Sequence, residues 1–433
     1  MTILDVIAAK RDGHKHTKPE LDWLARAAAR GEIADYQIAA WLMAAYIHPL
    51  DPEETAWLTL AMADSGERLD LTGLPKPWVD KHSTGGVGDK TSIVLLPLLA
   101  ACGLTVIKMS GRGLGITGGT VDKLESVPGF RMDLPPAELK AQATRIGLAI
   151  SGQTPNLAPA DKVFYGLRDA TATVGSIPLI VSSILSKKIA GGAETVVLDV
   201  KAGSGAFMKT LDAARELAAA LAATAKLAGL NARLAISDMD QPLGRTVGNA
   251  LEVGEAGMVL TGNEPSRFCE LCVDLAGLTL AAAGETWDLD TGRRKAREAL
   301  ASGRALQKAE AWFEAQGGDP AVLVRPDKLP RAPVQRYVLC GTEGWMGSID
   351  AETVGQIVVD LGGGRTRKED TIDPAVGVEV HREIGMRVTA DGPAFTVHAR
   401  DESDAEAAAE RLSRCFRISG DPVDLVPPLI ETL

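Results

Sequence analysis

The sequence is short of three features, and each shortage excludes a class of protein. Cysteine occurs only 5 times in 433 residues, an odd number at wide spacing that does not fit a disulfide framework. The formal net charge of −11 argues against general binding to nucleic acid or to an anionic membrane surface. Neither a signal peptide nor an apolar run of membrane-spanning length is present. A cytoplasmic enzyme with no nucleic-acid or membrane partner is therefore expected.

Glycine, in contrast, is concentrated in two stretches, at residues 80–92 and 108–125, on either side of an apolar segment. Glycines let the backbone approach an anion, serine and threonine donate hydrogen bonds, and lysine supplies positive charge. Neither stretch matches the P-loop or the dinucleotide-binding pattern. The combination predicts a site that holds free phosphate between two loops. The candidate side chains are Lys81, His82, Ser83, Ser92, Lys108, Ser110 and Thr120.

The apolar pattern predicts an α/β protein. Capping signals at Thr17 and Asp51 mark the starts of two early helices, and Gly66 is expected to end the second of these. From about Trp78 onward, strand-like segments such as 195–200 alternate with helical ones, which predicts a mostly parallel sheet flanked by helices. Ligands of such sheets bind beyond the carboxyl ends of the strands, where both glycine-rich stretches lie.

Three domains are expected. A discontinuous helical domain takes residues 1–66 and 159–190, because the second segment again has a helical pattern after the sheet has begun. An α/β phosphate-binding domain takes residues 70–158 and 191–332, and a small β-rich α+β domain takes residues 333–433. The cleft between the helical and α/β domains is the predicted place for the site.

The returning helical segment carries a second set of polar candidates, Arg168, Ser183 and Lys187. Ser183 and Lys187 are four residues apart and so lie on one face of a helix. Two plainer interpretations stay open, in which Lys187 belongs to a solvated helix end and Arg168 is structural, paired with Asp161 or Asp169.

The stretch SGRGLGITGGTVDKLE resembles the signature of the thymidine and pyrimidine-nucleoside phosphorylases. The likeness continues in order through DKHSTGGVGD, GQTPNLAPADK, FYGLRDATATVGSIPLIVSSILSKK, LDVKAGSGAFM and DMDQPLGRTVGNALEV. It implies a homodimer in which the helical domain closes on the α/β domain. The implied reaction is reversible phosphorolysis: inorganic phosphate and a pyrimidine nucleoside give the free base and an α-(deoxy)ribose 1-phosphate. No cofactor is required for this chemistry.

The resemblance also implies roles for single residues. The family's phosphate ligands fall on Lys81, His82, Ser83, Ser92, Lys108, Met109, Ser110 and Thr120. Its pyrimidine ligands fall on Arg168, Ser183 and Lys187, which makes His82, Arg168 and Lys187 the catalytic candidates. His82 is either a proton donor to the leaving base or a positioning residue.

Lys108 bears on the substrate range. By the resemblance, it corresponds to a lysine in relatives that accept both uridine and thymidine. Relatives restricted to thymidine have methionine at this position. An ammonium can donate a hydrogen bond to a ribose 2′-hydroxyl, and a thioether cannot. Activity on uridine, thymidine and deoxyuridine is therefore expected, with a thymidine phosphorylase restricted to deoxynucleosides as the alternative.

The broad-specificity relatives also bind a monovalent cation, potassium, and its implied ligands fall on Gly88, Leu243, Thr246 and Glu255. Backbone carbonyls with one carboxylate suit a hard cation. Lys90 stands where a small hydroxyl residue is usual, so its ammonium is an alternative occupant, and the sequence leaves both possibilities open.

A phosphoribosyltransferase of the same architecture is a further alternative. Its pyrophosphate leaving group would need an acidic pair for Mg²⁺, and Asp238 with Asp240 is the nearest candidate. A binding or regulatory protein built on this fold is disfavoured, because the sequence supplies candidates for both the phosphate and the pyrimidine.

Overall fold

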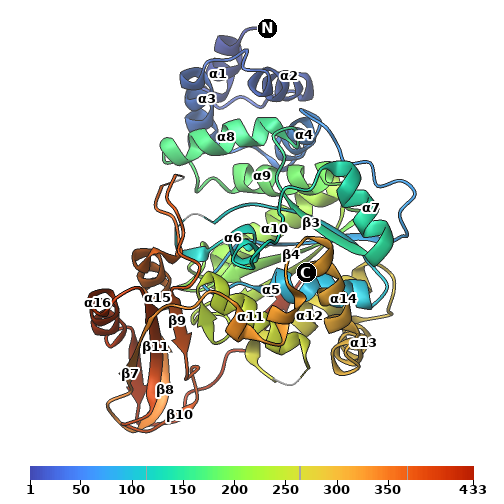
Figure 1. The fold of residues 1–433 in the computed structure, drawn as a ribbon. Coiled ribbons are helices and arrows are strands. Elements are labelled where there is room, and N and C mark those ends of the chain that lie inside the picture. Colours follow the sequence, from blue (N-terminus) through green and yellow to red (C-terminus); the bar gives the residue numbers. More distant parts are fainter. Residues whose placement is uncertain (114, 263–264, 368) are drawn as a thin grey trace.

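The computed structural model describes residues 1–113, 115–262, 265–367 and 369–433 (Figure 1). Six helices form the end of the molecule that carries the N-terminus; α4 lies level with α8, and α9 lies on the side of these two helices that faces the main sheet (Figure 1). These helices are α1 (Ile3–Arg11), α2 (Lys18–Ala29), α3 (Asp35–Ile47), α4 (Pro52–Ala63), α8 (Pro159–Ala170) and α9 (Ile177–Ala190).

Local capping sets the helix starts in this part of the chain. The backbone N–H groups of Glu53 and Glu54 each donate to Asp51 Oδ1 at 2.8 Å, and the Asp51 N–H donates to Glu54 Oε2 at 2.9 Å. The expected end of α4 at Gly66 is wrong, because the helix ends at Ala63. A Cβ on Gly66 would lie 2.0 Å from the Asn156 carbonyl oxygen. Gly66 is therefore needed for close packing against the loop at Asn156, which precedes α8, and not for ending α4.

The central sheet has six strands in the order β13-β5-β4-β1-β2-β3, and all neighbours except β13 and β5 are parallel. The strands are β1 (Trp78–Ser83), β2 (Thr105–Ser110), β3 (Leu148–Gly152), β4 (Thr195–Ala202), β5 (Asn231–Asp238) and β13 (Leu429–Thr432). Every residue of β4 is buried, as expected for a strand covered by helices on both faces.

Helices cover both faces of this sheet. Helices α9 and α10 pack on one face through residues such as Leu185 and Leu217, and α5, α11, α12 and α14 pack on the other through residues such as Ile93 and Trp312. The bounds are α5 (Thr91–Ala101), α6 (Thr120–Glu125), α7 (Pro136–Ile146), α10 (Leu211–Leu227), α11 (Asn249–Leu260), α12 (Arg267–Ala282), α13 (Leu289–Ala301) and α14 (Arg304–Ala315). The predicted α/β class with a mostly parallel sheet is confirmed.

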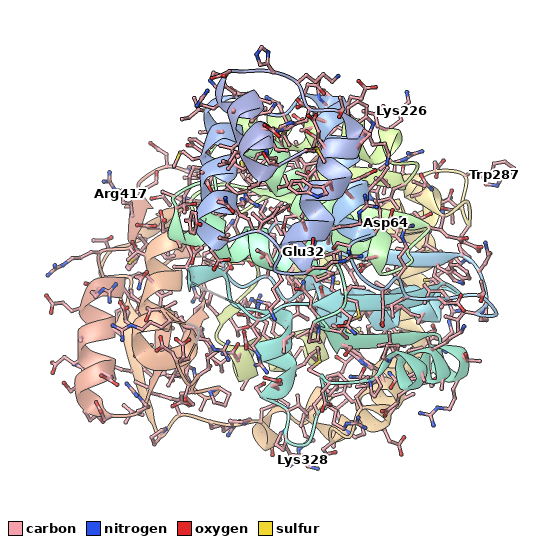
Figure 2. The ribbon with its side chains drawn as sticks, turned by 90° about the horizontal axis from the view of Figure 1, so that it is seen from above. Glu32, Asp64, Lys226, Trp287, Lys328 and Arg417 are labelled. Atoms are coloured by element: carbon pink, nitrogen blue, oxygen red, sulfur yellow. The ribbon has the colours of Figure 1, made fainter. Side chains whose placement is uncertain are left out.

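The C-terminal part is rich in short strands and has its own core. Its elements are β7 (Val334–Leu339), β8 (Gly344–Ile349), α15 (Ala351–Val358), β9 (Gly377–Val380), β10 (Arg387–Val388), β11 (Pro393–Ala399), α16 (Glu402–Leu412) and β12 (Phe416–Ser419). Figure 2 views the molecule from the helical end and shows this part to one side, with Arg417 of β12 at its edge.

Two strand pairings join residues from opposite sides of the expected domain boundary between residues 332 and 333. Strand β6 (Thr246–Val247) pairs with β9 of the C-terminal part, and β13 leaves that part to pair with β5 of the main sheet. These pairings are long-range, so the local apolar pattern could not reveal them. Among the described residues, no helix combines the length and apolar character that crossing a membrane would require.

Candidate active site

The predicted phosphate residues gather where two adjacent parallel strands end. His82 and Ser83 end β1, and Met109 and Ser110 end β2. Ser92 lies in the first turn of α5, which begins directly beyond the loop that follows β1. The first N–H groups of a helix have no partner within it and, together with the helix dipole, favour an anion. The structure thus brings both glycine-rich stretches to one edge of the sheet, and Thr120 begins α6 at the end of the second stretch.

The Lys81 ammonium is fixed by a buried network. Its Nζ donates to Thr91 Oγ1 at 2.5 Å and lies 3.3 Å from Asp199 Oδ2, and Lys81 is 1% exposed. Lys201 Nζ lies 2.6 Å from the same carboxylate oxygen. Because a buried charge is costly unless it is paired, Asp199 is what allows two lysines to lie inside the protein.

Asp89 organises the hydroxyl groups of the first loop. Thr91 Oγ1 donates to Asp89 Oδ1 at 2.6 Å, and Ser83 Oγ donates to Asp89 Oδ2. Burial alone would raise the pKa of Asp89, but Lys81 and its neighbouring lysines hold that pKa well below its usual range. Asp89 is therefore an ionised acceptor that orients Ser83 and Thr91.

Lys108 is buried and has an unusual titration. Its Nζ donates to the Lys81 carbonyl oxygen and lies 3.6 Å from Asp80 Oδ1. The other Asp80 oxygen accepts from Lys188 Nζ of α9 at 2.7 Å, which ties the helical domain to β1. The pKa of Lys108 is lowered to about 7: burial is the largest cause, Asp80 opposes it, and Lys188 and Lys81 act in the same direction as burial.

His82 lies between the two halves of the site. Burial is the largest cause that holds the pKa of His82 well below its usual value, followed by the positive charges of Lys188, Lys108, Lys187 and Lys81. Two of these lysines come from the strands β1 and β2, and two come from α9. The imidazole is therefore neutral at neutral pH, and the charges of lysines from both domains act on it.

The pyrimidine side is built on α8 and α9. Lys187 Nζ donates to Ser183 Oγ at 2.9 Å, so these side chains share one helix face, and it also donates to Asp161 Oδ2 of α8. The Lys187 side chain is 17% exposed. The alternative of a solvated helix end is wrong for Lys187, because Asp161 holds its ammonium in place.

Arg168 is turned toward the loop between α8 and α9. Its guanidinium donates to the carbonyl oxygens of Leu179 at 3.0 Å, Val174 at 2.6 Å and Thr173 at 3.4 Å. Asp161, one of the two partners considered for a structural Arg168, pairs with Lys187 instead. Arg168 thus shapes the loop in this structure, and its contact with a pyrimidine remains a prediction.

The residues expected to bind potassium meet around Lys90. Its Nζ donates to the carbonyl oxygens of Leu243 at 2.7 Å and Thr246 at 2.9 Å, and lies 2.8 Å from Glu255 Oε2. Gly88 is adjacent, since a Cβ there would lie 3.0 Å from the Leu243 carbonyl oxygen. Three of the four expected potassium ligands therefore contact an ammonium.

Sequence reasoning missed one contact from the C-terminal part. Arg365 Nη1 lies 2.7 Å from Asp122 Oδ1, and the Gly115 N–H donates to the Arg365 carbonyl oxygen at 3.0 Å. Asp122 Oδ2 accepts from the Gly113 N–H at 2.7 Å. The second glycine-rich stretch is thus held from outside the α/β domain, and no local signal marks Arg365. The missed acids Asp80, Asp89, Asp161 and Asp199 all lie in or beside the quoted motifs.

The acidic pair considered for Mg²⁺ is engaged elsewhere. Asp238 Oδ2 lies 2.5 Å from Arg267 Nη2, and Asp240 Oδ1 accepts from the Ser204 N–H at 2.9 Å. Burial raises the pKa of Asp238. Within the described part of the chain, no three His, Cys, Asp or Glu residues are grouped to hold a metal ion. The geometry gives no support to the phosphoribosyltransferase alternative.

Comparison with known proteins gives consistent results. Residues 75–306, more than half of the chain, match the family described as glycosyl transferase family, a/b domain. Residues 4–66 match its helical bundle domain, and residues 345–419 match the pyrimidine nucleoside phosphorylase C-terminal domain. Anthranilate phosphoribosyltransferase from Thermus thermophilus shares the fold, with a TM-score of 0.59 and 23% identity over 72% of this chain and 99% of that chain.

Curated relatives match over nearly the full length. The chain is 45% identical over 430 residues to the pyrimidine-nucleoside phosphorylase of Geobacillus stearothermophilus, covering 99% of both chains. It is 43% identical over 433 residues to that of Staphylococcus aureus (strain USA300), covering 100% of this chain and 99% of the relative. On this identity and coverage, the chain belongs to the pyrimidine-nucleoside phosphorylase family.

Proposed function

We propose that the protein catalyses the reversible phosphorolysis of pyrimidine nucleosides, with the two glycine-rich stretches as the phosphate site and α8 and α9 as the pyrimidine site. His82 carries the proposal, because the charges of lysines from β1 and β2 and of lysines from α9 act on the same imidazole. The full-length likeness to curated pyrimidine-nucleoside phosphorylases supports the same reaction.

In the proposed reaction, a phosphate oxygen forms a bond to the anomeric carbon while the bond from that carbon to the base nitrogen breaks. The electron pair of the broken bond goes to the base, which gains negative charge. Ser183 and Lys187 donate to the base oxygens, and losing one donor of this kind typically costs about 100- to 1000-fold in rate. Phosphate held in line by Lys81, Ser83 and Ser92 adds the benefit of orientation. The nucleophile is a substrate, so no activated serine or cysteine is needed.

His82 has two possible parts in this reaction. A neutral imidazole can donate one hydrogen bond, and a bound phosphate dianion would favour its protonated form, which could then transfer a proton to the leaving base. Replacing His82 by asparagine (His82→Asn) separates the two. Near-full turnover with an unchanged pH profile would exclude proton transfer and leave a positioning role.

The proposed substrates are uridine, thymidine and deoxyuridine. Lys108 is the reason, because its ammonium is a donor suited to a ribose 2′-hydroxyl. The test is kcat/KM for uridine and thymidine under the same conditions. A preference for thymidine above about 100-fold, roughly 2.7 kcal/mol, would instead indicate an enzyme restricted to deoxynucleosides.

The proposed assembly is a homodimer formed through the helical domain. Apolar side chains that the single chain leaves exposed include Leu4 of α1, Tyr36 and Ile47 of α3, and Tyr165 of α8. Helix α3 packs on both α1 and α8, so these residues come from neighbouring helices, and a contiguous exposed apolar patch is typical of an interface. The double variant Tyr36→Glu/Ile47→Glu should elute as a monomer with the matching light-scattering mass. Tyr337→Glu, at an exposed position of the C-terminal part, is the control.

The reaction itself is tested by the absorbance change when free uracil or thymine is released. Release should require inorganic phosphate and should be matched by formation of the pentose 1-phosphate. Base release at the same rate without phosphate would indicate a hydrolase, and no release at all would indicate a binding protein.

A further inference from the structure

Lys90 lies where the family resemblance places a monovalent cation, and the structure allows the two occupants to be compared. An ammonium has three N–H donors. Three oxygens lie around Lys90 Nζ, at 2.7 Å (Leu243 carbonyl), 2.9 Å (Thr246 carbonyl) and 2.8 Å (Glu255 Oε2). The hydrogen-bonding capacity of the ammonium is therefore used completely by the oxygens expected to bind potassium.

The surroundings leave no place for a second cation. Lys90 is 1% exposed, and its Nζ lies 5.1 Å from the centre of the Phe268 ring, which forms an apolar wall beside it. The carboxylate of Glu255 also accepts from the Arg245 N–H at 2.8 Å and from Thr246 Oγ1 at 2.6 Å. The Lys90 ammonium already occupies the oxygens of Leu243, Thr246 and Glu255, and a potassium ion at the same oxygens would place two cations side by side in a buried space. The residues present do not fit potassium.

The contacts of Lys90 link two segments that are far apart in the sequence. Lys90 directly precedes α5, whose first residues, Thr91 and Ser92, belong to the phosphate side of the site. Leu243 lies in the loop before β6, and Thr246 begins β6, the strand that pairs with β9 of the C-terminal part. A single buried ammonium therefore holds the first glycine-rich stretch against the segment that carries the C-terminal part.

We propose that the Lys90 ammonium is a built-in substitute for the monovalent cation, so that this protein folds and binds phosphate independently of potassium. A tethered cation is always present at the site, whereas a free ion must be bound from solution. Lys90 is a positioning residue in this proposal, because it acts through the loops that it joins. The proposal concerns stability as well as activity, and its stability readout does not depend on the proposed reaction.

The first test compares the natural protein in potassium, sodium and tetramethylammonium chlorides at equal ionic strength. We expect equal Tm values and equal KM for phosphate in the three salts. An ion at about 100 times its Kd would raise the Tm of a protein of this size by about 3 °C. A rise of about 2 °C or more that is specific to potassium would overturn the proposal, and a smaller one supports it.

The second test restores the space for an ion. Lys90→Thr supplies a small hydroxyl and removes the Lys90 ammonium from Glu255, so it should lower Tm in tetramethylammonium chloride and regain much of the loss in potassium chloride. Lys90→Met fills the space without a charge and should be destabilised equally in both salts. Lys226→Thr makes the same change on an exposed part of α10 (Figure 2) and should match the natural protein.

A Lys90→Thr protein whose Tm and phosphate KM ignore potassium would contradict the substitution. If that variant does not fold, the salt series on the natural protein still decides the question, because a bound potassium ion would raise its Tm. Loss of base release in every protein, with the expected Tm pattern kept, would refute the proposed reaction but not the role of Lys90.

Discussion

The lysines of the site are buried and paired with carboxylates, and this pairing sets their chemistry. Asp199 balances Lys81 and Lys201, and Asp80 balances Lys108 and Lys188. Removing one member of such a buried pair typically costs about 3–5 kcal/mol, because the remaining charge is left without a partner. The electropositive loops predicted from the sequence are therefore closer to neutral until a phosphate anion arrives.

Lys108 should couple phosphate binding to proton uptake. Its pKa of about 7 makes it mostly neutral at pH 8, and a bound phosphate anion favours the ammonium. Phosphate affinity should therefore fall as pH rises above 7, and binding at pH 8 should take up a proton. Calorimetry in buffers of different ionisation enthalpy measures this uptake. Lys108→Met should lose it, and equal uptake in both proteins would assign the proton to another group.

Lys188 should control the titration of His82. After burial, the positive charge of Lys188 is the largest cause of the low pKa of His82, so Lys188→Met should raise that pKa. Proton NMR of the histidine ring signals against pH measures the shift, and His82→Asn identifies the signal. A His82 resonance that titrates identically in both proteins would contradict the arrangement described here.

Several elements could be predicted from local sequence because local interactions set them. The capping boxes at Thr17 and Asp51 mark the starts of α2 and α4, and the segment 159–190 contains α8 and α9 as expected. The end of α4 was harder to predict, because Gly66 is required by packing rather than by helix termination.

The second glycine-rich stretch should depend on Arg365. Arg365→Ala removes the nearer of the two arginines on Asp122 Oδ1, at 2.7 Å, and leaves Arg112 at 3.2 Å; the other carboxylate oxygen accepts from the Gly113 N–H. We expect the KM for phosphate to rise by about tenfold, near 1.4 kcal/mol, because the phosphate ligands beside this stretch lose their orientation. Steady-state kinetics with phosphate varied at saturating nucleoside gives the value. Arg367→Ala, an exposed neighbour, is the control, and an equal effect in both variants would count against the positioning role.

At the scale of the whole molecule, strand pairings and an ion pair join the three parts. Strand β6 joins the C-terminal sheet, β13 joins the main sheet, and Lys188 of α9 binds Asp80 of β1. These contacts connect the helical and C-terminal parts to the α/β part that carries the predicted phosphate residues.

The last strand should protect the edge of the main sheet. A chain that ends at Pro422 would lack β13 and leave β5 as an open edge, which favours aggregation. We expect a Tm lower by several degrees, with larger species in light scattering. A truncated chain with the Tm and the size of the full chain would show that β13 is dispensable.

The sequence by itself determined the α/β class, the helix starts and the identity of the phosphate and pyrimidine candidates, because these depend on short-range pattern and on contiguous motifs. Only the tertiary structure decided which charges are paired. The bonds from Lys188 to Asp80, from Lys90 to the Leu243 carbonyl and from Arg365 to Asp122 join residues 108, 153 and 243 positions apart. Such pairs depend on how the strands and domains are arranged. That arrangement makes Lys90 a fully bonded internal cation and keeps His82 a neutral imidazole under the charges of lysines from β1, β2 and α9.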